Sequence, residues 1–207
     1  MTTAQLSTRD RLCEAAIHIA TRDGILAMTL DNVAREAGVS KGGVMYHFKT
    51  KDELVQAMLR YFGSRVEAML AHKVAHDPNP RGRWGRAFLA CVFPESGETP
   101  VDPTAPAGSA PLAPEVIERF LLATIAAAVN SPALMAPLRS LAQGLRDRML
   151  AEGEDGMDQL LVWLALDGLF LWQFVGLIDR GDPLFQQVGN AIRTRLEARS
   201  PAGEALP

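Results

Sequence analysis

Apolar residues recur at three- and four-residue spacing along most of this 207-residue chain. In the first such segment, Leu12, Ala16 and Ile19 fall on one face of a helix, and charged residues such as Arg9 and Arg11 occupy the other. No segment shows the strict alternation of apolar and polar residues that is typical of a strand. The pattern therefore predicts an all-α protein.

Capping residues and helix breakers divide this pattern into about nine helices. Thr29, Ser40 and Thr50 are placed to cap helix starts, Thr50 with Glu53 as a capping box, and Gly38 is placed to end a helix. The helices are expected at about 7–22, 30–37, 40–46, 50–76, 81–92, 114–129, 131–151, 157–178 and 183–199. Residues 94–111 are rich in Pro, Gly, Ser and Thr and are expected to form either a pocket lid or a disordered surface loop.

One segment, residues 160–178, is apolar on nearly all sides. Its length approaches the roughly 20 residues that cross a bilayer. However, Asp167 lies near its centre, and a charged residue there costs about 2.5–3.5 kcal/mol on insertion. We therefore interpret the segment as the centre of a helical bundle or of a dimer interface.

Charge and cysteine content narrow the class of protein only slightly. The net charge is −3 and the pI is about 5.8, so a purely non-specific nucleic-acid binder is disfavoured. Residues 1–60 carry a balance of +1 and the remainder −4, which permits a local cationic face. Cys13 and Cys91 have no metal-binding spacing, and the polar start of the chain has no features of a signal peptide, so we expect a cytoplasmic protein with reduced thiols.

The most informative segment is the short third helix and the turn before it. Ala37-Gly38-Val39-Ser40 separates two short helices, which is typical of a helix-turn-helix. The third helix contains Gly42 and Gly43, and each glycine disfavours a helix by up to about 1 kcal/mol relative to Ala. That cost is understandable if the helix backbone must approach another surface, such as a DNA groove, closely.

The run from Thr29 to Leu54 resembles the signature of the TetR/AcrR family of bacterial transcriptional regulators. The Ala-Gly-Val-Ser turn, the Tyr46-His47-Phe48 triplet and the Lys51-Asp52-Glu53-Leu54 opening of the fourth helix have the order and spacing of that family. The resemblance implies a DNA-binding domain at 1–55 and a ligand-binding and dimerisation domain at 56–200, followed by a frayed tail at 201–207. It also implies a ligand-responsive regulator, most often a repressor, that binds double-stranded operator DNA.

The resemblance also implies individual DNA contacts. Thr29, Tyr46, His47 and Lys51 would contact the phosphate backbone, Ser40 and Lys41 would lie at the edge of the major groove, and Gly42, Gly43 and Val44 would face the bases. Because two of the three base-facing residues are glycines, we expect DNA shape and backbone contacts to determine much of the operator choice.

The expected dimer is a homodimer in which helices of two subunits pair, with Leu164, Gly168, Leu171, Val175 and Gly176 at the interface. Two DNA-binding domains would then read half-sites about 34–36 Å apart. A pocket for a small, largely hydrophobic effector would be lined by residues from several helices, namely Trp84, Phe88, Cys91, Phe120, Thr124, Met135, Trp163 and Asp167.

For each apolar member of this set, ordinary core packing is the simpler interpretation. Asp167 is different, because a carboxylate in an apolar helix needs a partner. Arg139, Arg146, a donor across the dimer or a basic ligand would each serve.

Two other classes of protein remain as alternatives. One is an enzyme, but the chain contains no phosphate-binding glycine loop, nucleophile elbow or metalloprotease motif. His72 and His76 have i, i+4 spacing but lack a third metal ligand nearby, so we expect neither a metal nor a cofactor. The other is a helical ligand-binding protein that acts as an activator or does not bind an operator.

Overall fold

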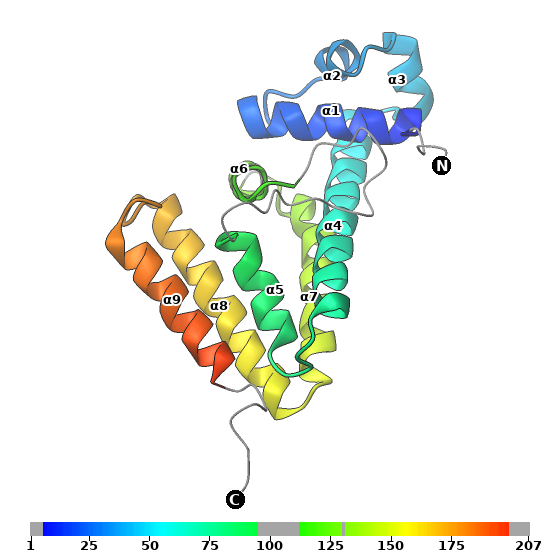
Figure 1. Ribbon diagram of the computed structural model, residues 1–207. Helices are drawn as coiled ribbons and strands as arrows, with labels where there is room; N and C mark the ends of the chain where they lie inside the picture. The colour runs from blue at the N-terminus through cyan, green and yellow to red at the C-terminus, as the bar shows by residue number, and fades with distance from the viewer. Residues whose placement is uncertain (1–5, 95–111, 130, 199–207) are drawn as a thin grey trace, which may run out of the picture. The chain divides into compact units, whose positions relative to one another are not determined.

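The computed structural model describes residues 6–94, 112–129 and 131–198 (Figure 1). Within them the chain is helical and contains no strand, as the sequence predicted. The helices are α1 (Thr8–Asp23), α2 (Leu30–Ala37), α3 (Lys41–His47), α4 (Lys51–His76), α5 (Arg83–Val92), α6 (Pro114–Ala128), the 3₁₀ turn η1 (Pro132–Met135), α7 (Ala136–Leu150), α8 (Glu154–Phe174) and α9 (Pro183–Glu197). The predicted lid or loop, beyond Pro94, and the predicted tail lie outside the described residues.

Contacts divide the described chain into two compact units. The first consists of residues 6–69 and 112–142, and the second of residues 70–94 and 143–198. Helix α4 contributes to both, and α6 belongs to the first unit because it packs on α1. The expected division into a DNA-binding domain at 1–55 and a second domain at 56–200 stays a prediction.

The first unit begins with three helices whose ends are fixed by local hydrogen bonds. The side chains of Ser7, Thr29 and Ser40 accept from backbone amides in the first turns of α1, α2 and α3. Gly38 ends α2 with φ +65°, a left-handed conformation that suits glycine. At α4, Thr50 accepts from the Glu53 amide as predicted, whereas the Glu53 carboxylate accepts from the Lys49 amide instead of that of Thr50.

The core of the first unit joins these helices to α4 and α6. Val33, Val44 and Phe48 are buried together with apolar residues of α1 and α4. Phe62 of α4 stacks on Phe120 of α6, with ring centroids 4.0 Å apart. Burial of this apolar surface is the main source of stability for such short helices.

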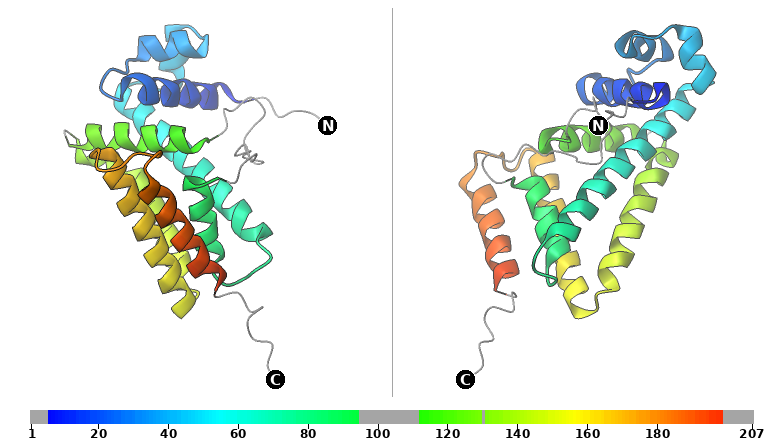
Figure 2. Two further views of the ribbon diagram at one scale, coloured as in Figure 1. Left: turned by 60° about the vertical axis from the view of Figure 1, so that its left-hand side comes forward. Right: turned by 45° about the vertical axis from the view of Figure 1, so that its right-hand side comes forward.

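The second unit is built around α5, α8 and α9, which run alongside one another (Figure 2). Its core contains Leu89, Phe93, Val162, Leu166, Leu169, Phe185, Ile192 and Leu196. Close packing depends on two glycines, because a Cβ at Gly85 or Gly189 would lie within 3 Å of Leu196 or Phe93 respectively.

Helix α5 has no side-chain cap of its own. Instead, the fully buried Gln159 of α8 accepts hydrogen bonds from the amides of Trp84 and Gly85 at 2.6 and 3.3 Å. The Gln159 amide donates in turn to Glu152 and Asp155. A residue of another helix thus satisfies the free donors at the start of α5.

Candidate nucleic-acid interface

The recognition-type helix α3 presents a small exposed surface with one cationic side chain. Lys41, Gly42, Met45 and Tyr46 are exposed, and the Tyr46 side chain reaches 80% exposure. The Tyr46 ring meets that of His47 edge to face, with centroids 5.1 Å apart. An aromatic side chain this exposed on a helix rich in glycine is typical of a surface that contacts a partner.

The structure accommodates the two glycines of α3 differently. A Cβ at Gly42 would meet only the Ser40 hydroxyl, at 3.9 Å, so the free protein has room for a side chain there. A Cβ at Gly43 would lie 3.4 Å from the same hydroxyl, which caps the helix by accepting from the Gly43 amide. The absence of a side chain at Gly42 is therefore not required by the fold.

Val44 corrects one sequence prediction. Its side chain has no exposed surface and packs in the core of the first unit, so it cannot touch a base in this conformation. The reason is helical geometry, since a helix of seven residues that packs on its neighbours must turn at least one apolar side chain inward.

Several predicted phosphate contacts already have partners within the chain. The Thr29 hydroxyl accepts from the Asn32 amide in the capping box of α2, and the Lys51 ammonium donates to the Leu26 carbonyl oxygen at 2.8 Å. Lys51 therefore ties the loop before α2 to the start of α4. Lys41 Nζ lies 3.0 Å from the Asp31 carboxylate on α2. Sequence reasoning missed this last partner because the two residues belong to different helices.

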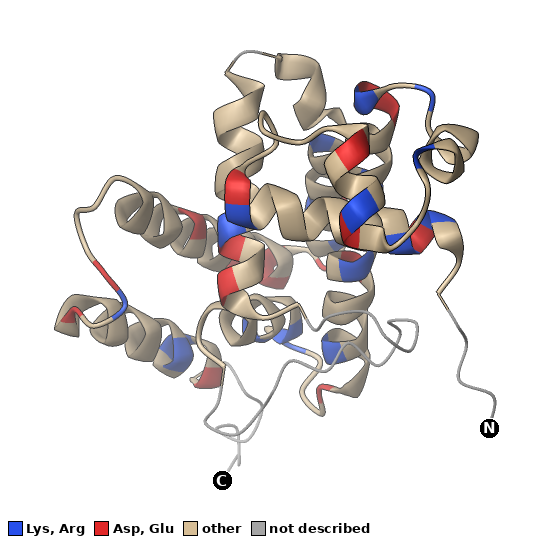
Figure 3. Ribbon diagram, turned by 90° about the horizontal axis from the view of Figure 1, so that it is seen from above, with Lys and Arg blue, Asp and Glu red and all other residues tan. Residues whose placement is uncertain are grey.

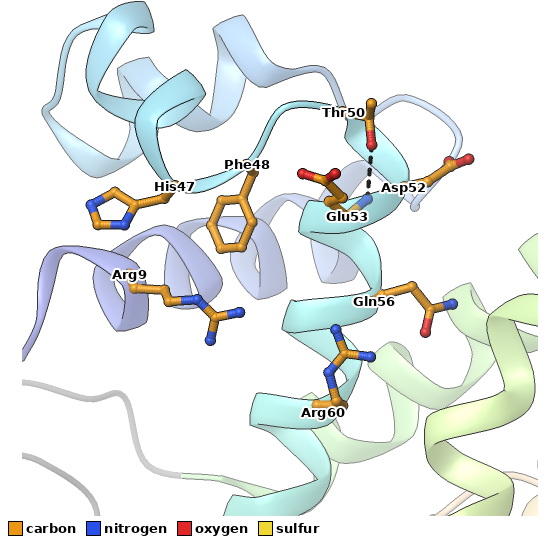
Figure 4. A pocket seen from close by; sticks show the side chains of 8 residues that line it. All are labelled: Arg9, His47, Phe48, Thr50, Asp52, Glu53, Gln56 and Arg60. Atoms are coloured by element: carbon orange, nitrogen blue, oxygen red, sulfur yellow. Dashed lines mark hydrogen bonds between the residues drawn. The ribbon is translucent and has the colours of Figure 1, made fainter.

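An open cleft of about 470 Å³ lies beside the end of α3 (Figure 4). Its walls are Arg9 of α1, His47 and Phe48 at the end of α3, and Thr50, Asp52, Glu53, Gln56 and Arg60 at the start of α4. The Arg9 guanidinium lies 5.2 Å from the centre of the Phe48 ring. The cleft contains none of the residues predicted to bind the effector, and its mixed charges do not form a single basic or acidic site.

The residues predicted for the effector pocket fall into two groups. Phe120, Thr124 and Met135 belong to the first unit, where Phe120 and Thr124 are fully buried and the Thr124 hydroxyl donates to the Phe120 carbonyl oxygen. Trp84, Phe88, Cys91, Trp163 and Asp167 belong to the second unit.

In the second unit, α5 and α8 bring aromatic residues together. Phe88 stacks on Trp163 with centroids 4.8 Å apart and planes 15° from parallel. The Trp84 indole donates to Glu152. Cys91 donates to the Ala87 carbonyl oxygen, and burial raises the pKa of its thiol to about 11, so the thiol remains protonated at neutral pH. These contacts explain the packing of the group; a role in effector binding stays a prediction.

Asp167 corrects a second prediction, because its side chain is exposed on α8 rather than buried in a pocket. Its carboxyl nevertheless lies against neighbouring side chains. This partial desolvation raises the pKa of Asp167 to about 6, and a hydrogen bond with Trp163 opposes the shift. Of the arginines considered as partners, Arg146 pairs with Asp147.

His72 and His76 stack on each other with centroids 4.0 Å apart. In the described part of the chain, no His, Cys, Asp or Glu joins them in a group of three that could hold a metal ion. Each of the helices in residues 6–94, 112–129 and 131–198 falls short of the length and apolarity that a membrane span requires.

Three helices with an exposed, capped third helix define a helix-turn-helix DNA-binding protein. Residues 12–58 match the family described as "Bacterial regulatory proteins, tetR family", and residues 82–197 match "Tetracyclin repressor-like, C-terminal domain". The chain belongs to the TetR family and is a transcriptional regulator of that kind.

Named relatives agree with this assignment. The chain is 44% identical over 52 residues to the HTH-type transcriptional regulator SrpR of Pseudomonas putida, a match that covers 25% of this chain and 24% of that protein. It is 32% identical over 84 residues to the HTH-type transcriptional repressor KstR2 of Mycobacterium tuberculosis, covering 41% and 42% respectively. Both matches thus span less than half of the regulator concerned.

Solved structures match over much more of the chain. The multidrug binding protein EbrR in complex with ethidium is 25% identical with a TM-score of 0.60, covering 92% of this chain and 98% of that one. A TetR-family transcriptional regulator from Rhodococcus sp. has the same fold, with 20% identity, a TM-score of 0.63, and coverage of 92% and 97%.

Proposed function

We propose that the protein is a homodimeric repressor that binds a palindromic operator and is released by a small, largely hydrophobic effector. The observation that carries the DNA-binding part is helix α3, which exposes Lys41, the Gly42 backbone and Tyr46 on one short capped helix. Such a protein regulates chromosomal DNA, so the compartment we propose is the cytoplasm.

The proposed dimer interface is an apolar seam on α8. Met157, Leu161, Leu164, Leu171 and Val175 are each 50–57% exposed, and Gly168 continues their alternating spacing of four and three residues. This is the spacing with which two helices pair along a common stripe. The opposite face of α8, with Val162, Leu166 and Leu169, is already buried in the second unit, so the seam is free to meet a second copy.

All five residues predicted for the interface, including Gly176, are exposed on α8 or directly after it. At Gly168 a Cβ would meet nothing within 4 Å in the single chain. Glycine at this position therefore has no packing role within the chain, and close approach of a second helix would supply one.

The effector part of the proposal draws on the likeness to EbrR, which has been crystallised with ethidium, proflavin and malachite green. These dyes are aromatic cations, and the stacked Phe88–Trp163 pair supplies aromatic surface of a suitable kind. The sequence suggested a basic ligand only because Asp167 was expected to be buried and to need a partner. Asp167 is exposed on α8, so this reason for a positively charged effector no longer holds.

The DNA-binding part is tested by selecting bacterial genomic fragments with the purified protein and measuring binding by fluorescence anisotropy. Lys41→Ala and Tyr46→Ala should each weaken operator binding by about 1–3 kcal/mol. Arg22→Ala, which removes an exposed cation from α1, is the matched control and should have little effect. If no fragment is enriched, or if the control weakens binding as much as Lys41→Ala, operator binding through α3 is refuted.

The dimer is tested by the double substitution Leu164→Glu and Leu171→Glu, with Val129→Glu as a control at an exposed apolar position directly after α6. We expect the double variant to be a folded monomer by light scattering and to lose operator binding. A double variant that remains dimeric would exclude this seam as the interface.

The effector class is tested by thermal unfolding of the protein without DNA in the presence of ethidium, proflavin or malachite green. A ligand at 100 times its Kd stabilises the native state by about 2.7 kcal/mol. Absence of a shift with all three dyes would contradict an effector that resembles these aromatic cations.

A further inference from the structure

The only lysine or arginine of α3 does not stand alone on that helix. Lys41 Nζ lies 3.0 Å from Oδ1 of Asp31 and donates a hydrogen bond to Oδ2 at 3.1 Å. Asp31 lies in the first turn of α2, and both side chains are 63% exposed. A pair this exposed contributes little to folding stability, so DNA can displace it.

The contact matters because α3 has few other side chains that can read a base. Gly42 and Gly43 have none, Val44 is buried, and the Ser40 hydroxyl accepts from the Gly43 amide. A lysine can donate bidentately to guanine O6 and N7, but it can equally bind any phosphate. The contribution of Lys41 to specificity therefore depends on what limits its binding to phosphates.

Asp31 supplies that limit in two ways. Its negative charge offsets the attraction of Lys41 for phosphates, which are the same at every sequence. Its two oxygens also hold the ammonium beside the first turn of α3 until DNA displaces the pair, so the lysine approaches the groove from the side of the helix that would read it. Acidic and basic segments are interleaved along the helices instead of forming a single basic face (Figure 3), so one carboxylate can alter the local balance.

We propose that Asp31 is a specificity-determining positioning residue: by pairing with Lys41 it suppresses binding to non-operator DNA and orients the lysine for a base edge. This inference rests on the proposed operator binding. It predicts that Asp31→Asn strengthens binding to unrelated DNA more than binding to the operator, so that the preference for the operator falls at least about fivefold, the lower end for one base contact.

The experiment compares an operator duplex, selected from genomic DNA by the wild-type protein, with a scrambled duplex of equal length at 50 and 200 mM KCl. Each lysine freed for a phosphate steepens the salt dependence by about 0.9, or about 1.8 for a dimer. The affinity gain of Asp31→Asn on the scrambled duplex should therefore be about 12-fold larger at 50 mM than at 200 mM salt.

Two further variants separate this role from a general change of charge. Asp23→Asn also removes a carboxylate from an exposed ion pair, with Arg22 on α1, and should leave the operator preference unchanged. In a Lys41→Met background, Asp31→Asn should lose most of its effect. Circular dichroism checks that each variant is folded.

The inference is overturned if Asp31→Asn behaves like Asp23→Asn, or if its effect persists without Lys41 while the wild type still prefers the operator. If the wild type selects no operator at all, the proposed function fails first and the inference fails with it.

Discussion

A buried ion pair joins α1 to α4 inside the first unit. Arg65 Nη1 donates to Glu14 Oε1 at 2.5 Å, and the Tyr61 hydroxyl donates to the same oxygen at 2.8 Å. Glu14 is 8% exposed and Arg65 is 4% exposed, so neither charge has much access to water. Removal of one partner therefore takes this ion pair away from a charge that stays buried in a medium of low dielectric constant.

We expect Glu14→Met and Arg65→Met each to lower the free energy of unfolding by about 3–5 kcal/mol. For a chain of this length each kcal/mol corresponds to roughly 2–4 °C in Tm, so the expected loss is about 6–20 °C. Tyr61→Phe removes only a hydrogen bond to the carboxylate and should cost about 1–2 kcal/mol.

The decisive variant carries both Glu14→Met and Arg65→Met. Because it removes both charges of the pair together, it should be more stable than either single variant, in which one of the two charges stays buried without the other. Urea unfolding at one fixed protein concentration gives the three free energies, since dimerisation would otherwise shift them. If the losses of the two single variants simply add in the double variant, the pair does not couple the helices and the reasoning is refuted.

Three further predictions concern the second unit. Gly156→Ala should destabilise the protein by about 3 kcal/mol because its Cβ would collide with the Met149 carbonyl oxygen. In the control Gly144→Ala the new Cβ meets nothing within 4 Å, so this variant should be neutral or slightly more stable than the wild type. Equal melting temperatures of the two variants would contradict this prediction. Gln159→Leu should cost about 2–3 kcal/mol, measured by urea unfolding, because two buried amides of α5 lose their acceptor; an unchanged midpoint would show that they find another. The pKa of Asp167 is raised to about 6 from its ordinary value of 3.8, so the folded state binds this proton more tightly than the unfolded state, and stability falls as the pH rises from 3.8 to about 6. Asp167→Asn should therefore raise stability at pH 7.5 and change it little at about pH 3, below both pKa values, and the reverse order would contradict the shift.

The DNA-binding part of the fold could be predicted because its signals are local. Thr29 and Ser40 accept from amides three residues ahead, and Gly38 adopts the left-handed conformation that its position indicated. Each of these interactions involves neighbours in sequence, so the residue types alone are informative.

The apolar segment around α8 shows why other features could not be predicted. When nearly every residue of a helix is apolar, periodicity does not reveal which face packs inward, and Asp167 was assigned to a pocket instead of the exposed side. Val44 was misplaced for a related reason, since its neighbours on α3 gave no indication of the inward face.

The remaining features that could not be predicted from the sequence are long-range polar contacts. The Glu14–Arg65 pair spans 51 residues of sequence and the Gln159–Trp84 contact spans 75. Glutamate and glutamine are usually surface residues, so the residue types alone do not indicate that Glu14 and Gln159 are buried. Only the packing of the helices brings each of these two side chains to its partner.

The dependence of α5 on Gln159 also has a consequence for how the chain is made. The helix that starts at Arg83 leaves the ribosome without the side chain that completes its first turn, and that side chain follows 75 residues later than Trp84. At about 5–20 residues per second this interval lasts roughly 4–15 seconds. During that time the nascent helix has only its own weak propensity to hold it, so the second unit acquires its order late, after α8 has been synthesised.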